Sequence, residues 1–236
     1  MEKAVKKKAR EPIADPARLL DIPDFNSVVG LGPQYVVTTA LGWGAVMLVG
    51  AAFINTANIT SPYLIAAILL FAGCGIAVCL RTEQLVWKLV TGLIAWLTLG
   101  SMFGLIVKQL APELVFIILG TVMLLHAGWA VAGFCTQIDT GGLSQLLMIV
   151  FAGIFVVRIV TPLLAPVGDP TMGGLTVLAD TCLVMVSALL TFADFSDIRE
   201  KSLPLVSAVK VGTEVALNAA ASITIIMLLA RSVMVP

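Results

Sequence analysis

The chain is polar over its first 34 residues and then alternates between long apolar runs and short polar breaks. An α-helix needs about 20 mainly apolar residues to cross a bilayer. Runs of about that length recur along the rest of the chain. The pattern predicts seven transmembrane helices, at residues 35–55, 62–80, 86–107, 112–135, 142–163, 172–193 and 203–231.

The predicted fold class is therefore all-α, a polytopic membrane protein in two parts. Residues 1–34 are expected to form a cytoplasmic polar segment, and residues 35–235 a seven-helix transmembrane domain. A glycine-to-proline spacing also recurs, because Gly50 and Gly100 each precede a proline by twelve residues. This spacing is consistent with three helical hairpins followed by a seventh helix, or simply with glycine in helices and proline in turns.

Basic residues in the breaks indicate the orientation. They concentrate in the N-terminal segment and in the breaks at 81–88 and 194–203, whereas the breaks at 55–61 and 164–171 contain none. Cytoplasmic loops are enriched in lysine and arginine. We therefore expect a cytoplasmic N-terminus, an external C-terminus, and a location in a bacterial inner membrane.

Composition excludes several classes of protein. Hydrophobic residues make up 59% of the chain and charged residues 12%, whereas soluble domains contain about 25% charged residues. The net charge is zero and no cluster of basic and aromatic residues occurs, so no nucleic-acid partner is expected. With one histidine and no nucleophile or phosphate-loop motif, neither an enzyme nor a bound cofactor is predicted. The four cysteines have no metal-site spacing and are expected to be buried, inert thiols.

Charged residues inside the last two apolar runs are the main functional signal. Ionisable groups are costly at membrane depth and commonly mark ion or proton pathways. Asp194 ends the sixth run, and Lys210, Glu214 and Asn218 follow one another at intervals of four in the seventh. Asp194 and Lys210 are about equally far from the break between the two runs, so we expect them to meet. An ion pathway and a set of packing hydrogen bonds both fit this arrangement.

His126 lies near the middle of the fourth run, at the depth expected for Glu214. It is either a packing residue or a pH-sensitive group, because a free imidazole titrates near pH 6.5. Burial and neighbouring charges shift the protonation of such groups. The net charge of the whole set is therefore expected to change between mildly acidic and neutral pH.

Arg158 and Asp180 lie at similar predicted depths in the fifth and sixth runs. An unpaired charge at that depth is unfavourable by several kcal/mol unless its side chain reaches water. We therefore expect a structural ion pair, with a gating role as the alternative.

Four segments carry a resemblance to a known family: Thr98-Leu-Gly-Ser-Met-Phe103, Ala111-Pro-Glu113 with Thr121, Asp139-Thr-Gly-Gly-Leu143, and Leu190-Thr-Phe-Ala-Asp-Phe-Ser-Asp-Ile198. Together they resemble the transmembrane Bax inhibitor motif family. The resemblance implies seven helices and a pH-sensitive gate on a calcium leak, formed by one acidic residue near the end of helix six and another in helix seven. Asp194 corresponds to the first of these, and Glu214 is the best match to the second.

The hairpin spacing is also similar to that of HdeD-type acid-resistance membrane proteins, which have six helices in three hairpins. The leading functional hypothesis is a pH-sensitive cation leak channel, with calcium as the implied ion. The alternatives are an accessory or structural subunit that packs against other membrane subunits, and an HdeD-like acid-stress protein. The lipid bilayer is a partner in all three.

Overall fold

The computed structural model describes residues 33–53, 62–136, 140–164, 170–198 and 203–234, and these form seven helices without a strand. The polar N-terminal segment lies outside the described residues up to residue 32. The helices are α1 (Pro33–Phe53), α2 (Pro62–Arg81), α3 (Leu85–Val107), α4 (Pro112–Cys135), α5 (Gly141–Leu164), α6 (Pro170–Ile198) and α7 (Leu205–Met234). The predicted all-α class is confirmed.

The helices begin where the sequence favours a helix start. α1, α2, α4 and α6 all begin with proline, whose missing N–H is not needed in the first turn and whose fixed φ suits a helix. One boundary differs substantially from the expectation, because α6 continues to Ile198 instead of ending at 193. Asp194 and Asp197 therefore lie within the last helical turns, where both carboxylates contact other segments.

Long apolar side chains are exposed on the outer faces of the bundle. Leu70, Phe116, Leu124 and Ile149 are each about 70% exposed or more. Five helices are long and apolar enough to cross a membrane, and α2 and α5 contain shorter apolar stretches within the described residues. Helices that are apolar on every side are typical of a bilayer environment. The protein is an integral membrane protein whose outer surface faces lipid.

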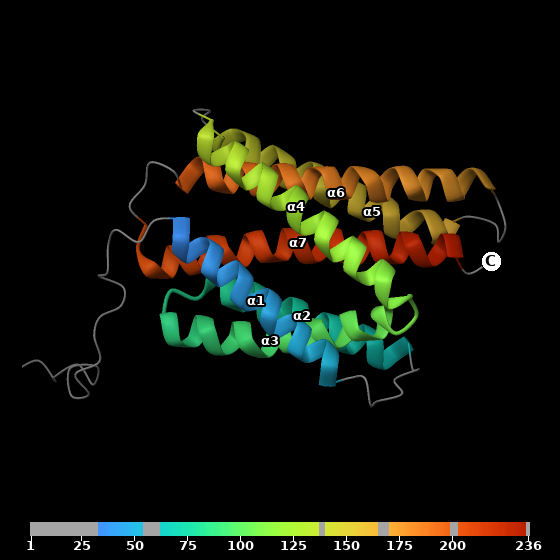
Figure 1. The fold of residues 1–236 in the computed structure, drawn as a ribbon, viewed down its shortest axis with the longest axis horizontal. Coiled ribbons are helices and arrows are strands. Elements are labelled where there is room, and N and C mark those ends of the chain that lie inside the picture. The colour runs from blue at the N-terminus through green and yellow to red at the C-terminus, as the bar shows by residue number, and fades with distance from the viewer. Residues whose placement is uncertain (1–32, 54–61, 137–139, 165–169, 199–202, 235–236) are drawn as a thin grey trace, which may run out of the picture.

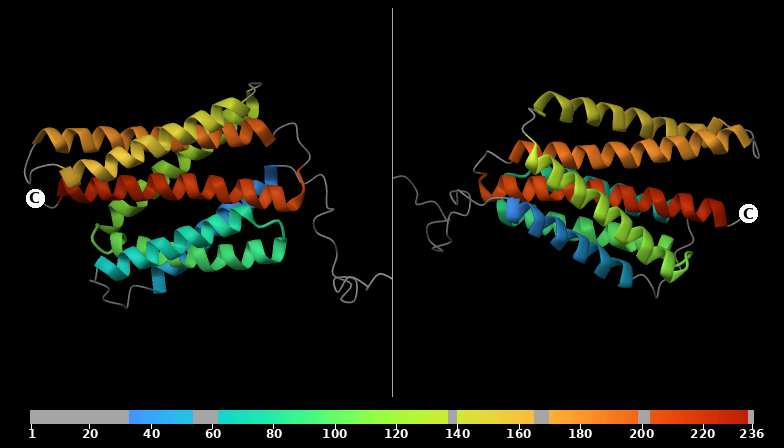
Figure 2. Two further views of the ribbon diagram at one scale, coloured as in Figure 1. Left: turned by 180° about the vertical axis from the view of Figure 1, so that it is seen from behind. Right: turned by 45° about the horizontal axis from the view of Figure 1, so that its top comes forward.

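Two groups of three helices pack on either side of α7 (Figure 1). In the first group α3 packs against both α1 and α2, and in the second α6 packs against both α4 and α5. Helices of one group make few contacts with helices of the other, and both groups pack against α7. Figure 2 shows α7 between the two groups. We call α1–α3 the first unit and α4–α6 the second unit.

The three-hairpin organisation expected from the glycine and proline spacing is wrong. Of the pairs α1–α2, α3–α4 and α5–α6, only the last is a closely packed pair. Glycines decide the packing instead. A side chain on Gly50 would overlap the carbonyl oxygen of Leu97, and one on Gly133 would overlap that of Phe192. These glycines let α1 approach α3, and α4 approach α6, at backbone distance.

Two of the cysteines also differ from expectation. All four thiols are free, and Cys79 is buried as predicted. Cys74 and Cys135 are exposed on the outer faces of their helices, because each lies on a side of its helix that no neighbour covers.

Candidate functional site

A polar stripe runs along α7. Lys210, Glu214, Asn218 and Ser222 follow at intervals of four residues, which places them on one side of the helix. The Lys210 ammonium and the Glu214 carboxylate are 3.9 Å apart, with side chains 51% and 35% exposed. The stripe thus begins with a loose, accessible ion pair near the start of α7. We call this end of the bundle, where α1, α3, α5 and α7 begin, the inner end.

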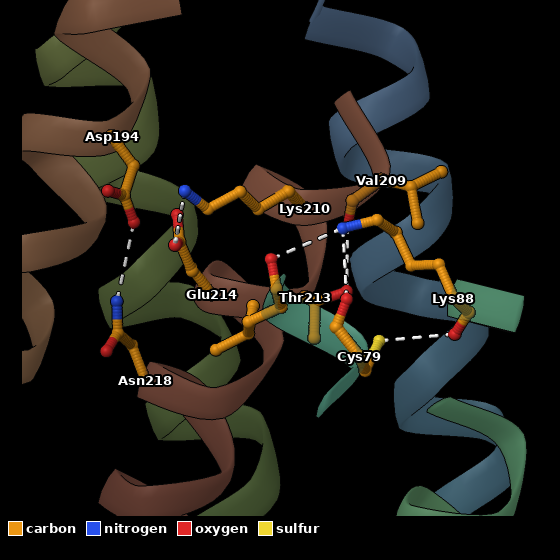
Figure 3. Close-up of polar contacts among 9 residues, drawn as sticks. Cys79, Lys88, Asp194, Val209, Lys210, Thr213, Glu214 and Asn218 are labelled. Atoms are coloured by element: carbon orange, nitrogen blue, oxygen red, sulfur yellow. Dashed lines mark hydrogen bonds and ion pairs between the residues drawn. The ribbon is translucent and has the colours of Figure 1, made fainter. Parts of the chain in front are cut away.

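α6 presents a matching row of polar side chains to the stripe. Asn218 Nδ2 donates to Asp194 Oδ2 over a long 3.5 Å (Figure 3). One and two turns further from the inner end come Thr191 and Ser187, and both side chains are fully buried. The Ser187 hydroxyl hydrogen-bonds to that of Ser222. Polar groups of α6 therefore meet the α7 stripe at two successive levels.

His126 of α4 closes the deep end of this arrangement. Its Nδ1 is 2.8 Å from Thr191 Oγ1, and its Nε2 is 3.0 Å from Ser222 Oγ. The ring is 5% exposed. Both ring nitrogens are thus engaged, one with α6 and one with α7, so His126 joins three helices.

We call these eight side chains the polar seam: Asp194, Thr191, Ser187, Lys210, Glu214, Asn218, Ser222 and His126. From Lys210 to Ser222 it extends over twelve residue steps of α7, about 18 Å at 1.5 Å per residue. Beyond it, the apolar side chains of Ile223 and Met227 are buried in the core. The seam is therefore accessible at the inner end and closed by apolar packing towards the other end.

Two expectations about the seam need correction. Asp194 and Lys210 form no ion pair among the described residues, because Asp194 faces Asn218 and Lys210 faces Glu214. His126 does not lie at the depth of Glu214. Its partner on α7 is Ser222, eight residues further along and about 12 Å deeper. α7 begins further towards the inner end than α4 ends (Figure 1), so counting residues from the helix ends misjudged the relative depth.

Lys88, near the start of α3, is a buried charge that sequence reasoning did not identify. It is 1% exposed. Its ammonium donates to the carbonyl oxygens of Cys79 at 3.0 Å and Leu80 at 3.4 Å, and the Cys79 thiol donates back to the Lys88 carbonyl oxygen (Figure 3). Carbonyls at a helix C-terminus lack helical partners and favour a cation. Lys88 thus closes the α2–α3 hairpin. The sequence signal that could have indicated its burial is its position, because Lys88 is the fourth residue of an apolar run.

Further polar contacts support the inner half of the molecule. Trp43 Nε1 donates to Thr213 Oγ1 at 3.0 Å and links α1 to α7. Thr140, just before α5, donates to Asp197 Oδ1 at 2.5 Å. Asp197 therefore places a second carboxylate one turn from Asp194, on the inner side of the seam.

Arg158 and Asp180 lie outside the seam, at the opposite end of the second unit. Arg158 Nε donates to Asp180 Oδ1 at 2.7 Å, and the side chains are 28% and 3% exposed. Asp180 is seven residues from Ser187, about 10 Å along α6. The contact ties α5 to α6 and does not extend the seam.

A groove of about 960 Å³ opens between α1 and α4 on another side of α7. Its floor includes Ala216, Ala219 and Ala220 of α7, and its walls are apolar apart from a few groups such as His126 and Thr191. The stripe residues Lys210, Glu214 and Asn218 are not among its lining residues. The charged part of the seam and the groove are therefore separate openings.

The acidic residues do not form a ready metal site. No group of three or more histidine, cysteine, aspartate or glutamate side chains is positioned to hold a metal ion within the described ranges. Calcium takes six to eight oxygen ligands, whereas Asp194 and Glu214 are accompanied by the Lys210 ammonium (Figure 3). The geometry fits protons or weakly held cations better than a tightly bound calcium ion.

Comparison with known proteins yielded no assignment, because no family model and no curated protein matches the chain.

Proposed function

We propose that this protein carries small cations across its membrane through the polar seam, and that protonation of Asp194 and Glu214 controls the passage. The proton is the ion best matched to the side chains, and calcium is the ion implied by the family resemblance. A bacterial inner membrane is the proposed location.

The observation that supports this function is the succession of polar side chains along the seam. Carboxylate, ammonium, amide, hydroxyl and imidazole groups follow one another from the accessible Lys210–Glu214 pair to the buried His126. Hydroxyl and imidazole groups both donate and accept hydrogen bonds, so they can pass a proton along. Ionisable groups at membrane depth are costly and commonly mark ion or proton pathways.

The charged groups around the inner half determine how it responds to pH. Asp194 approaches from α6, Lys210 and Glu214 from α7, and Lys88 lies on the α3 side (Figure 3). Asp197 lies one turn from Asp194 on α6 and accepts a hydrogen bond from Thr140. Protonation of Glu214 removes the partner of Lys210, and protonation of Asp194 changes its contact with Asn218. Either event changes the charge at the mouth, so cation passage should depend on pH.

The test is ion flux into liposomes that contain the purified protein. Proton flux is followed with an enclosed pH dye and calcium flux with an enclosed calcium dye, at external pH values from 5 to 8. Wild type is compared with Asp194→Asn, Glu214→Gln and the control Glu113→Gln, which removes an exposed carboxylate in the first turn of α4.

We expect flux above that of empty liposomes, with its pH dependence altered in the two seam variants and unchanged in the control. Flux no greater than in empty liposomes, or the wild-type pH dependence in both seam variants, would overturn the proposal. Flux of protons without calcium would exclude a calcium leak while retaining the seam as a proton path.

An accessory subunit is the second candidate, and one observation favours it. Gly120 and Gly128, eight residues apart on α4, have open space where a side chain would stand. Small residues on an uncovered helix face allow close approach of another membrane helix. Isolation of the chain in a stable complex with other membrane subunits, together with no flux by the chain alone, would favour this role.

A further inference from the structure

The two three-helix units repeat the same contacts. Trp43 and Gly50 of α1 lie seven residues apart, as do His126 and Gly133 of α4. Trp43 stacks on Trp96 and Gly50 meets Leu97, the next residue of α3. Correspondingly, His126 contacts Thr191 and Gly133 meets Phe192, the next residue of α6. The α1–α3 and α4–α6 interfaces therefore share one register.

The remaining helix of each unit follows the same correspondence. A side chain on Gly75 of α2 would meet Ala95, the residue before Trp96. Ile154 of α5 packs on the cluster that contains Leu190, the residue before Thr191. If Gly75 is matched to Ile154, then Leu70 matches Ile149 and Val78 matches Val157. All four of these residues are exposed. All three helices of one unit thus have counterparts in the other.

The contacts with α7 locate the symmetry axis. Trp43 bonds to Thr213, and its counterpart His126 bonds to Ser222. The midpoint between these two α7 residues falls between Leu217 and Asn218. α1 runs from the inner end and α4 runs towards it, so the units have opposite directions (Figure 1). An approximate two-fold axis through the middle of α7, lying in the membrane plane, relates the two inverted units. The units meet α7 differently, because the first packs on it mainly through α1 and the second mainly through α6.

We infer that the protein is an alternating-access carrier in which the two inverted units rock against α7, a mechanism that rests on the proposed cation transport. Inverted repeats with their binding site at the repeat interface near mid-membrane are the architecture of many carriers. Here Asn218 lies next to the axis and contacts Asp194. The transported cation binds at this pair and at Glu214.

The two halves of the α7 stripe differ in their side chains. The inner half of the α7 stripe holds the exposed Lys210–Glu214 pair. In the outer half, the two-fold relation matches Ile225 to Lys210 and Ala221 to Glu214. Both Ile225 and Ala221 are apolar and half-buried. On this mechanism the described structure corresponds to the inward-facing state, because the exposed part of the stripe lies in the inner half. Exchanging the conformations of the two units closes the inner half and opens the outer half.

The packing permits such a movement. The two units make few close backbone contacts with each other, and both pack against α7, with which they share one apolar cluster. The groove between α1 and α4 leaves space where the units would otherwise touch. Lys88 links α2 to α3 at the inner end of the first unit. The Arg158–Asp180 pair links the equivalent helices α5 and α6 at the outer end of the second unit. Each unit is thus held as one body.

The test measures distances between spin labels on α2 and α5 in lipid nanodiscs. The labels are attached through non-canonical amino acids, so the four native cysteines remain. One pair is placed at Val78 and Ile149 towards the inner end, and its symmetry-related pair at Leu70 and Val157 towards the outer end. All four side chains are at least 46% exposed, so labels there disturb little packing. A control pair within the first unit is placed at Leu70 and Leu93.

Distances are recorded at pH 5 and pH 8, with and without Asp194→Asn and Glu214→Gln. The titratable and charged groups that face the seam are Asp194, Asp197, Glu214, Lys210, Lys88 and His126. We expect two populations in each inter-unit pair. Conditions that favour the shorter inner distance should favour the longer outer distance, while the control pair keeps one distance.

A single population in both inter-unit pairs under all conditions, or changes in the same direction at both ends, would overturn the carrier mechanism. If liposome flux is present in that case, the seam conducts as a channel and the proposed function stands. If the opposed movements occur without any flux of protons or calcium, the carrier architecture stands and the proposed cation transport is wrong.

Discussion

The Arg158–Asp180 contact allows a quantitative test, because the two partners differ in burial. The Asp180 side chain is 3% exposed and that of Arg158 is 28% exposed. Replacement of Arg158 by methionine leaves a carboxyl group alone in an apolar site. Removing one partner of a buried ion pair typically lowers the free energy of unfolding by about 3–5 kcal/mol, and we expect Arg158→Met to fall in that range.

The reciprocal change should have a smaller effect. In Asp180→Leu the remaining guanidinium is already partly exposed, and it lies six residues from the end of α5, about 9 Å away. A long basic side chain near a helix end can extend to the interface, so we expect a loss of about 1–2 kcal/mol. The double variant replaces the pair with apolar groups and should be within about 1 kcal/mol of wild type.

The assay is reversible unfolding in mixed micelles by titration with a denaturing detergent, followed by circular dichroism. Arg231→Met, which removes an exposed arginine in the last turn of α7, is the control and should change little. The thermodynamic cycle should give a coupling free energy of several kcal/mol. Additive single effects, or a greater loss in Asp180→Leu than in Arg158→Met, would contradict this account of the pair.

Three further predictions concern topology and packing. Reporters fused at residues 57 and 168 and at the C-terminus should respond outside and one at residue 84 inside, and an internal C-terminus would rule out seven spans. Gly133→Ala should lower the unfolding free energy by at least 1 kcal/mol, because its new methyl group meets the Phe192 carbonyl oxygen. Gly128→Ala faces open space and should cause no loss in the same titration. Lys88→Met should lower it by about 2 kcal/mol by removing charged hydrogen bonds to Cys79 and Leu80, and equal stability would show that those carbonyls need no cation.

The sequence by itself determined the number of helices, their approximate bounds and the residues worth examining. Every backbone N–H and C=O must be bonded within the protein in lipid, and a continuous apolar run of about 20 residues meets this requirement as a helix. The interval of four between Lys210, Glu214 and Asn218 placed these residues on one side of the predicted seventh helix. Similar predicted depths also suggested that Arg158 and Asp180 meet, and they lie 2.7 Å apart.

Only the tertiary structure decided which helices are neighbours and which polar groups meet. Helices that are apolar on all sides carry no polar face to reveal their orientation, so hairpins were expected where two inverted three-helix units exist. Close approach at Gly50 and Gly133, tilted axes and a few buried hydrogen bonds set the arrangement. These features placed His126 beside Ser222 instead of Glu214, kept Asp194 inside α6, and buried Lys88 against the end of α2. Each depends on residues far apart in the chain, and no local pattern encodes their meeting.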